Sequence, residues 1–458
     1  MNEGRSGEEI PTNPTQDSIQ EILHKVIIAH QQALSLLQQT EAAYGRLVPH
    51  QLLNLLEAKS IVDVKLGDQV ERKMTIMFSD IRDFTPLSES MTPSENFEFI
   101  NSYLSQMEPV ISRHRGIIDK YIGDTIMALF EHGADDAVSG AIAMLERLAY
   151  YNAGRERAGY APVNIGIGLN TGVVMIGTVG GINRMDSTVI GDAVNLTARL
   201  EEATKTYHAP LIISQNTLYD LADPKKYDIR FLDRIRVKGK SQPLSIYEIF
   251  DNDPEELRNS KRDTLAMFEK AVAYYHLKDV AKSIPLLKQC IDISPNDYPA
   301  LIYLERCYEF QATGQHFGTG ELQNGLMWKE EHTGLAKVDD AHRLLMERIN
   351  ILTARIDQNE CGDFADIFPF LTQHAQHLFP IEEKLMREHN YPFAEGHAQE
   401  HKRFIENFTE LEKKAGNHME DPRYLAFRTE LLLLDWFASH ATKADRHFAR
   451  SLLTNKPK

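Results

Sequence analysis

Two short stretches of the sequence each place an aspartate where a predicted strand ends. In MFSDIRDFT (residues 77–85), Asp80 ends a run of alternating apolar residues. In DKYIGDTIMALF (residues 119–130), Asp124 follows a glycine in the turn of a predicted hairpin. Two carboxylates on facing strand ends are the ligands that a pair of Mg²⁺ or Mn²⁺ ions needs for phosphoryl chemistry. The sequence therefore predicts a two-metal site that acts on a nucleotide.

Length and composition restrict the class of protein. A chain of 458 residues is too long for one hydrophobic core, so we expect several domains. A formal net charge of −16, with no basic cluster, argues against nucleic-acid binding. The apolar runs are shorter than the roughly 18 residues of a membrane helix, and the first residues lack a signal-peptide core. The three cysteines are scattered, without a CxxC spacing. We expect a cytoplasmic, soluble protein without membrane insertion.

Composition and hydrophobic periodicity divide the chain into five segments. They are a disordered N-terminus (1–17), a coiled-coil or signalling helix with its connector (18–72), a catalytic domain (73–250), a helical spacer with a glycine-rich linker (251–325) and a C-terminal helical domain (326–458). The spacer loosely resembles one tetratricopeptide unit. A single such repeat cannot bury its own face, so a plain helical spacer is an equal alternative.

The first predicted helix spans residues 18–45. Its apolar residues recur at spacings of three and four, and two registers fit equally well. A short parallel coiled coil that pairs two chains is one interpretation. An amphipathic helix that folds against its own domain is the other.

Residues 73–250 alternate between strand and helix patterns. The predicted elements are strands at 74–79, 163–170, 173–179, 187–190, 228–237 and 244–250, a hairpin at 117–130 and helices at 93–115, 134–153 and 193–206. This order predicts an α+β domain with a largely antiparallel sheet and helices on one face.

Several motifs in this segment resemble, in order, those of the class III nucleotidyl cyclases, which make cyclic nucleotides from triphosphates. They are the two aspartate stretches, TVIGDAVNLTARL (188–200) and VKGK (237–240). The resemblance implies a ferredoxin-like βαββαβ fold and a homodimer with two equivalent sites. It assigns the metal ions to Asp80 and Asp124, the ribose to Asn195, the reacting phosphate to Arg199, the terminal phosphates to Lys238, and the phosphate-facing backbone to Ile81 and Phe84.

The predicted base-reading pair favours ATP. Lys120 matches the purine-reading lysine of the family, and Thr188 occupies the partner position. An ammonium group can only donate, so it suits N1 of adenine, which accepts, and not N1–H of guanine. Guanylate cyclases usually have glutamate and cysteine at these two places. A guanylate cyclase is therefore the weaker alternative.

Two positions depart from the family pattern. Asp83 stands where glycine is common, which would put a carboxylate close to the phosphates. Val173 stands where some members have an arginine, and Arg184 is a weak substitute for it.

Histidines gather in the C-terminal segment, which holds ten of the eighteen. The stretches MWKEEHTGLAKVDDAHRLL, EEKLMREHNYPFAEGHAQEHKRF and DWFASHATKADRHF resemble the hemerythrins, which are up-down four-helix bundles that hold a non-heme di-iron centre and bind O₂. The resemblance implies a ligand set of His342, His377, Glu382, His397, His401, His440 and Asp445. Imidazoles with a bridging carboxylate suit iron, although other metals remain possible.

The second predicted bundle helix departs from the hemerythrin spacing. The family has His-x3-Glu, whereas here Leu378 fills that position and His377 comes one residue early. A one-residue bulge near Pro380 would turn both ligands inward. The alternatives are a site of six ligands, or His374 in place of His377. Four further histidines are expected at the surface, namely His332, His389, His418 and His447.

The complete prediction is a homodimeric adenylate cyclase with a C-terminal di-iron domain. O₂, another diatomic ligand or the redox state of the iron would regulate the catalytic domain. One alternative is that the bundle binds O₂ or iron without affecting the enzyme.

Overall fold

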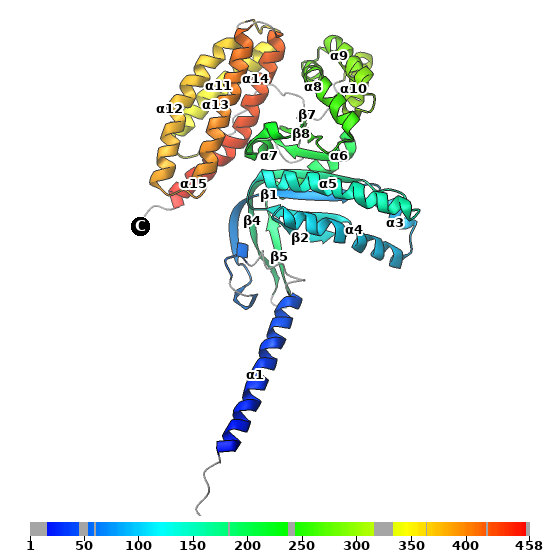
Figure 1. Cartoon of the computed structure of the whole chain (residues 1–458). Helices are drawn as coiled ribbons and strands as arrows, with labels where there is room; N and C mark the ends of the chain where they lie inside the picture. Colours follow the sequence, from blue (N-terminus) through cyan, green and yellow to red (C-terminus); the bar gives the residue numbers. More distant parts are fainter. Residues whose placement is uncertain are drawn as a thin grey trace, which may run out of the picture.

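The computed structural model describes residues 16–44, 54–58, 61–181, 184–236, 243–315, 333–362, 364–417 and 420–454. Figure 1 shows a sheet domain at the centre, helix α1 (Gln16–Tyr44) projecting from it, and two helical groups at the opposite end. None of the helices within these ranges is both long and apolar enough to cross a membrane.

The central domain is built on one eight-stranded mixed sheet, with strand order β2-β3-β1-β4-β6-β8-β7 and with β5 paired to β4. The strands are β1 (Gln69–Ile81), β2 (Gly116–Ile122), β3 (Thr125–Phe130), β4 (Ile165–Gly181), β5 (Arg184–Ile190), β6 (Leu211–Ser214), β7 (Ile229–Arg236) and β8 (Pro243–Ile249). The β4–β6 pair is parallel and the other pairs are antiparallel. The predicted strands 163–170 and 173–179 form the single strand β4, and β6 was not predicted.

Helices cover both faces of this sheet, so the prediction of helices on one face is wrong. They are α3 (Phe84–Glu89), α4 (Pro93–Arg113), α5 (Ala134–Arg157), α6 (Asp192–Tyr207) and α7 (Gln215–Asp220), with short 3-10 turns η1 (Ile61–Asp63) and η2 (Pro224–Lys226). Met77 and Ile81 of β1 lie in a core with α4 and α5. Leu196 and Leu200 of α6 pack with Ile212 and Ile246 in another core. An amphipathic pattern shows that a helix packs on a sheet, but not on which face.

Helix α4 illustrates how local sequence sets an element. The Thr92 hydroxyl accepts from the Glu95 backbone N–H, and the Glu95 carboxylate accepts from the Thr92 N–H at 2.8 Å, which forms a capping box. Pro93 occupies the first helical position, where its missing N–H costs nothing. Phe99, Tyr103 and Met107 recur at intervals of four and are buried.

The segment after the sheet consists of three helices packed against it. These are α8 (Glu255–His276), α9 (Val280–Ile293) and α10 (Tyr298–Thr313). Phe268 and Tyr303 from these helices share one hydrophobic core with Phe231 of β7 and with Phe379 and Trp436 of the C-terminal helices. The region predicted as a spacer therefore belongs to the packed body of the molecule.

The C-terminal helices form a closed four-helix arrangement. They are α11 (Ala336–Asp357), α12 (Ile367–Glu388) after the turn η3 (Phe364–Asp366), α13 (Ala394–Gly416), and α14 (Pro422–Trp436), which continues through a π-helical segment η4 (Phe437–Ala444) into α15 (Asp445–Thr454). Each helix packs on the next and α14 also packs on α11. Hereafter α11 to α15 are called the bundle.

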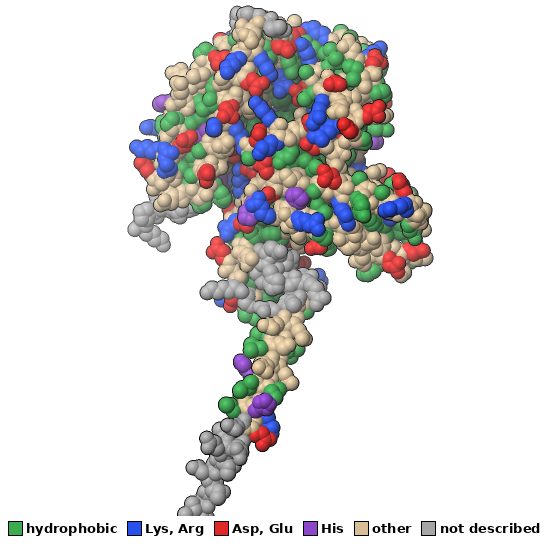
Figure 2. Space-filling model, viewed as in Figure 1, with side chains coloured by type: hydrophobic (Ala, Val, Ile, Leu, Met, Phe, Trp, Pro, Cys, Tyr) green, Lys and Arg blue, Asp and Glu red, His purple; other side chains and the backbone are tan. Residues whose placement is uncertain are grey.

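The described side chains of helix α1 do not pack against its own domain. Every side chain described between residues 21 and 40 is exposed. Figure 1 shows the helix standing clear of the sheet domain, and Figure 2 shows apolar side chains along it. Leu36 is 65% exposed and Leu23 is 58% exposed. The alternative in which this helix folds against its own domain is therefore wrong. Residues 1–15 of the predicted disordered terminus lie outside the described ranges.

Candidate functional site

The two predicted metal-binding aspartates lie together at one edge of the sheet. Asp80 is at the end of β1, and Asp124 is in the β2–β3 turn after Gly123, whose φ is 65°. The Ile81 backbone N–H donates to Asp124 Oδ2 at 3.2 Å. The Thr125 hydroxyl donates to Asp80 Oδ1 at 2.7 Å. The ladder between β1 and β3 thus brings together two carboxylates that are far apart in sequence.

The electrostatics of this pair favour a cation. Burial, and then the negative charge of Asp80, raise the pKa of Asp124 to about 6. Lys205 Nζ lies 3.2 Å from Asp80 Oδ2 and compensates part of the charge. Carboxylate oxygens are the ligands that Mg²⁺ and Mn²⁺ prefer. The residues present fit the divalent ions that the sequence predicted.

The loop after Asp80 explains one departure from the family pattern. Asp83 has φ 53° and lies in the left-handed region, where glycine is the usual residue and aspartate is tolerated. Its side chain is exposed, Ile81 is buried and Phe84 is half-buried. Behind the loop, Arg82 forms an ion pair with Glu201 of α6 at 3.0 Å, which ties β1 to that helix.

The predicted base-reading residues also meet, although their strands are not neighbours in the sheet. Lys120 Nζ of β2 lies 3.4 Å from Thr188 Oγ1 and 3.5 Å from the Ser187 carbonyl oxygen, both on β5. Strand β5 reaches β2 because Val189 packs in a core with Ile117 of β2. The arrangement presents an ammonium donor and a hydroxyl at one point of the domain.

Asp119 is a residue that the sequence reasoning missed. Its side chain is 0% exposed, and its nearer carboxylate oxygen lies 3.4 Å from Lys120 Nζ. Neither carboxylate oxygen has a hydrogen-bond partner among the described residues. Burial raises the pKa of Asp119, and the positive charge of Lys120 opposes that shift. The β2–β3 ladder shifts register at this position, which a sequence pattern does not reveal.

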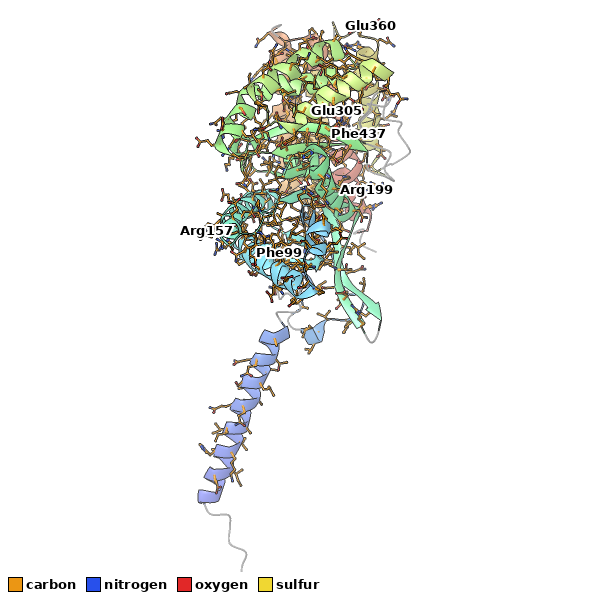
Figure 3. The ribbon with its side chains drawn as sticks, turned by 90° about the vertical axis from the view of Figure 1, so that its right-hand side faces the viewer. Phe99, Arg157, Arg199, Glu305, Glu360 and Phe437 are labelled. Atoms are coloured by element: carbon orange, nitrogen blue, oxygen red, sulfur yellow. The ribbon has the colours of Figure 1, made fainter. Side chains whose placement is uncertain are left out.

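The remaining predicted cyclase residues lie on α6 or outside the described ranges. Asn195 is exposed and Arg199 is partly exposed, one helical turn apart. Figure 3 labels Arg199 on α6, well separated from Phe99 on α4. Val173 on β4 is 40% exposed. Lys238 lies in a stretch that the structure does not describe.

A second cluster of ligand-type side chains lies inside the bundle. Its six buried members come from α11, α12, α13, η4 and α15 and are His342, Glu382, His397, His401, His440 and Asp445. The ligand atoms of Glu382, His397, His401 and His440 lie within 4.8 Å of one another, as do those of His342, Glu382 and Asp445. Glu382 belongs to both groups, which is the arrangement of a carboxylate that bridges two positions.

Asp445 makes short contacts with three histidines of this cluster that are poorly aligned as hydrogen bonds. Asp445 lies 2.8 Å from His342 Nε2, 3.0 Å from His397 Nε2 and 3.2 Å from His440 Nε2. Even so, the ring nitrogens of His342 and His397 and both carboxylates of Glu382 and Asp445 have no hydrogen-bond partner among the described residues. Buried polar atoms that converge without pairing are costly unless a cation satisfies them.

Protonation suits metal binding at His401 and His397 but not at His440. Burial lowers the pKa of His440, but the negative charges of Asp445 and Glu400 outweigh burial and raise it to about 10, so this ring would have to lose a proton to bind a metal. Burial lowers the pKa of His401 to about 2 and that of His397 below its ordinary value, so both rings are neutral at pH 7. Two nearby carboxylates support the cluster from outside. Glu400 Oε2 lies 2.8 Å from His440 Nδ1, and Glu383 Oε1 lies 3.2 Å from His401 Nδ1. Carboxylates of this kind orient metal-binding imidazoles.

The π-helical segment η4 aligns two members of the cluster. His440 and Asp445 are five residues apart, about 140° around an ideal α-helix. Here the Asp445 backbone N–H donates to the His440 carbonyl, an i→i+5 bond that places both on one face. The sequence reasoning expected a bulge near Pro380, but α12 runs unbroken through Pro380.

The prediction for the second bundle helix is corrected accordingly. His377 is exposed and does not belong to the cluster. His374 is buried at 7% exposure, and its Nε2 has no partner among the described residues. His374 lies two turns from Glu382 and is the α12 histidine that faces the bundle interior. The structure brings together the six-residue set that was one of the alternatives.

Comparison with known proteins identifies the central domain. Residues 67–250 match the family described as the adenylate and guanylate cyclase catalytic domain, so the chain contains a class III nucleotidyl cyclase catalytic domain. It is 36% identical over 297 residues to the terminal-differentiation specific adenylate cyclase of Dictyostelium discoideum. The aligned stretch covers 64% of this chain and 14% of that protein. It is 39% identical over 233 residues to an adenylate cyclase of Anabaena cylindrica, which covers 50% of this chain and 46% of that protein.

The solved structures include the adenylyl cyclase CyaB from P. aeruginosa, with 34% identity and a TM-score of 0.37. That similarity covers 40% of this chain and 96% of the other. The chain spans less than half the length of the two relatives from Dictyostelium and Anabaena.

Proposed function

We propose that the chain is an adenylate cyclase that converts ATP into 3′,5′-cyclic AMP and pyrophosphate. The observation that carries the proposal is the contact between Lys120 and Thr188 in a domain that also pairs Asp80 with Asp124. The similarity to adenylate cyclases from two organisms supports it.

The base is selected by hydrogen-bond polarity. Lys120 donates to N1 of adenine, and Thr188 accepts from the exocyclic amino group. Guanine presents N1–H and a carbonyl at the same places, so the Lys120 ammonium would oppose a donor. Asp119 would orient the ammonium group, because its buried carboxylate lies 3.4 Å from Lys120 Nζ.

The reaction joins the ribose 3′-oxygen to the α-phosphorus and breaks the bond to the β-phosphate, with loss of the 3′-hydroxyl proton. Asp80 and Asp124 would hold two Mg²⁺ or Mn²⁺ ions, which supply charge neutralisation and a more acidic hydroxyl. Asn195 orients the ribose, and Arg199 stabilises the charge that develops on the reacting phosphate. Lys238 and the backbone near Ile81 and Phe84 contact the phosphates.

We propose a homodimer in which each site takes its metal residues from one subunit and its base-reading residues from the other. The exposed apolar residues of α1 support this assembly, because a lone helix with such a surface is unstable in water. A parallel coiled coil of two α1 helices buries them.

The test is product formation by the purified chain from ATP and from GTP, with Mg²⁺ or Mn²⁺. We expect cyclic AMP as the main product and loss of activity in Asp80→Asn. The double variant Lys120→Glu with Thr188→Cys should shift the preference toward GTP. Efficient cyclic GMP formation by the unaltered chain would favour the guanylate cyclase alternative.

We also propose that the bundle holds two iron ions through the six-residue cluster, with His374 as a seventh ligand in place of His377. The sharing of Glu382 between two groups of ligand atoms and the unpaired buried atoms support a two-metal site. Bound iron would supply a redox-active centre that takes up O₂ or another diatomic molecule. Its state would regulate the catalytic domain.

The regulatory part is tested on iron-loaded protein, under anaerobic conditions and in air, by following iron absorbance and cyclic AMP formation together. A rate that changes with the spectrum supports regulation. A constant rate with intact iron favours a bundle that binds its ligand without affecting the enzyme. Substitution of His401 by alanine is a better control than deletion, because the bundle shares a core with α8–α10.

A further inference from the structure

Strand β1 meets the bundle through a lysine held between two carboxylates. Lys73 Nζ lies 3.0 Å from Asp220 Oδ1 at the end of α7 and 3.3 Å from Glu400 Oε1 on α13. The side chains are 30%, 18% and 21% exposed, respectively, so water screens the three charges only in part. One ammonium therefore pairs with two carboxylates at once, one in the catalytic domain and one in the bundle.

The bundle partner is also bonded to the buried cluster. Glu400 uses one oxygen for Lys73, and its other oxygen, Oε2, accepts from His440 Nδ1 at 2.8 Å. His440 Nε2 in turn lies 3.0 Å from His401 Nε2, inside the cluster. An unbroken series of polar contacts thus runs from the cluster to β1 through a single carboxylate.

Neighbouring contacts surround this connection. Glu71, two residues before Lys73 and on the same face of β1, pairs with His447 of α15. Asp220 Oδ2 accepts from the Ala134 backbone N–H at the start of α5. A cavity of about 1130 Å³ opens between the two parts and is lined by Lys73, Glu400 and the cluster residue His397. The space allows these side chains to move.

We propose that Glu400 is a positioning residue that couples the state of the bundle cluster to strand β1 by sharing the Lys73 ammonium with Asp220. This inference rests on the proposed metal site. A metal bound at the cluster would make the His440 ring a stronger donor from Nδ1, and Glu400 would then hold Lys73 less strongly. Lys73 shifts toward Asp220, which also holds the first turn of α5.

The coupling has a direct structural path to the catalytic residues. Strand β1 pairs with β4 along all of residues 69–81, and Asp80 lies on it seven residues after Lys73. A change in how Lys73 is held therefore acts on the strand that presents a metal ligand of the catalytic site. Coupling of this kind is reciprocal, so occupancy of the catalytic site also changes the affinity of the cluster for its metal.

The test compares amide hydrogen exchange of residues 69–81 in metal-free protein and in protein loaded anaerobically with Fe²⁺. Iron content and absorbance are measured on the same samples. We expect loading to change the exchange of this strand about fivefold or more in the unaltered chain. In Lys73→Met the iron content stays the same and the change in exchange disappears. Glu400→Gln, which keeps an acceptor for His440, also loses the change in exchange, and its absorbance shifts.

A matched control is Lys270→Met. Lys270 of α8 forms a 2.9 Å ion pair with Glu420 at the bundle, and neither residue contacts the cluster or β1 in the described structure. This variant should respond to iron as the unaltered chain does. If the unaltered chain takes up no iron, the proposed metal site and this inference fail together. If iron binds and the strand responds equally in Lys73→Met, the inference alone is overturned.

Discussion

Arg230 of β7 forms a bidentate ion pair with Asp297, the residue before α10. Nη1 and Nη2 each donate to a carboxylate oxygen at 2.7 Å, and both side chains are 0% exposed. Arg230 Nε donates to Glu248 at 2.6 Å, and Lys261 of α8 donates to the same carboxylate at 2.8 Å. This buried network joins α8 and α10 to the edge of the sheet. Helices α8 to α10 are therefore tied to the sheet by buried charged groups as well as by apolar packing.

Replacing Arg230 by methionine should destabilise the central domain by about 3–5 kcal/mol, because it leaves the buried Asp297 carboxylate without its charged partner and Glu248 with Lys261 alone. The free energy of unfolding in urea measures this loss. Arg262→Met is the control, since Arg262 pairs with Asp228 at the surface and its loss should have little effect. Equal destabilisation by both changes would show that burial of the network is unimportant.

Asp119→Asn should raise the KM for ATP about tenfold with a smaller effect on kcat, because Lys120 loses the charge that aims its ammonium group. Steady-state kinetics with ATP and GTP measure the effect. The ratio of kcat/KM for ATP to that for GTP should fall. Asp186→Asn is the matched control, as Asp186 is an exposed carboxylate on β5 near the same site. An unchanged KM would remove Asp119 from base recognition.

His377→Ala should leave iron content and absorbance unchanged, because the side chain is exposed on α12. His397→Ala should lose most of the iron, since His397 is 4% exposed and lies in the cluster. Metal analysis of the purified variants decides the point. Loss of iron in His377→Ala would mean that α12 adopts the bulged form that the sequence spacing suggested.

The unfolding free energy should depend on pH through Glu430. Burial raises the pKa of this α14 carboxyl from 4.5 to about 7, while the hydroxyl of Thr353 donates to it and opposes the shift. The group contributes stability that is fully present below pH 4.5 and is lost as the pH rises through about 7. The loss is up to about 3 kcal/mol.

Glu430→Gln should remove this pH dependence and raise the Tm relative to the unaltered chain at pH 8. Thermal unfolding between pH 5 and pH 8 measures the difference. Glu347→Gln, at an exposed carboxylate on α11, should keep the original profile. A Tm that falls by the same amount from pH 5 to pH 8 in both variants would contradict the assignment.

The Asp80–Asp124 pair was predictable because each aspartate has a local signal, a strand end for Asp80 and a glycine turn for Asp124. The pairing of β1 with β3 then brings the two carboxylates together. The resemblance to the hemerythrins implied seven ligands, and the structure brings six of them together in the buried cluster. The error at His377 has a physical cause: α12 stays α-helical through Pro380, so His377 and Glu382, five residues apart, lie on different faces of the helix.

Other features depend on contacts that no local pattern encodes. The face that α6 covers, the crossing of β5 to Lys120 and the link from Glu400 to Lys73 are all set by tertiary packing. Strand β6 has only four residues, and its apolar run is too short to separate strand from helix.

The length of β1 has a mechanical consequence. Lys73 and Asp80 are separated by roughly 23 Å of extended chain, at about 3.3 Å per residue. Every residue of that span pairs with a residue of β4, so we expect this part of β1 to resist bending. A small displacement of the strand at Lys73 should therefore also displace Asp80. A softer connection, such as a loop of the same length, would dissipate the displacement.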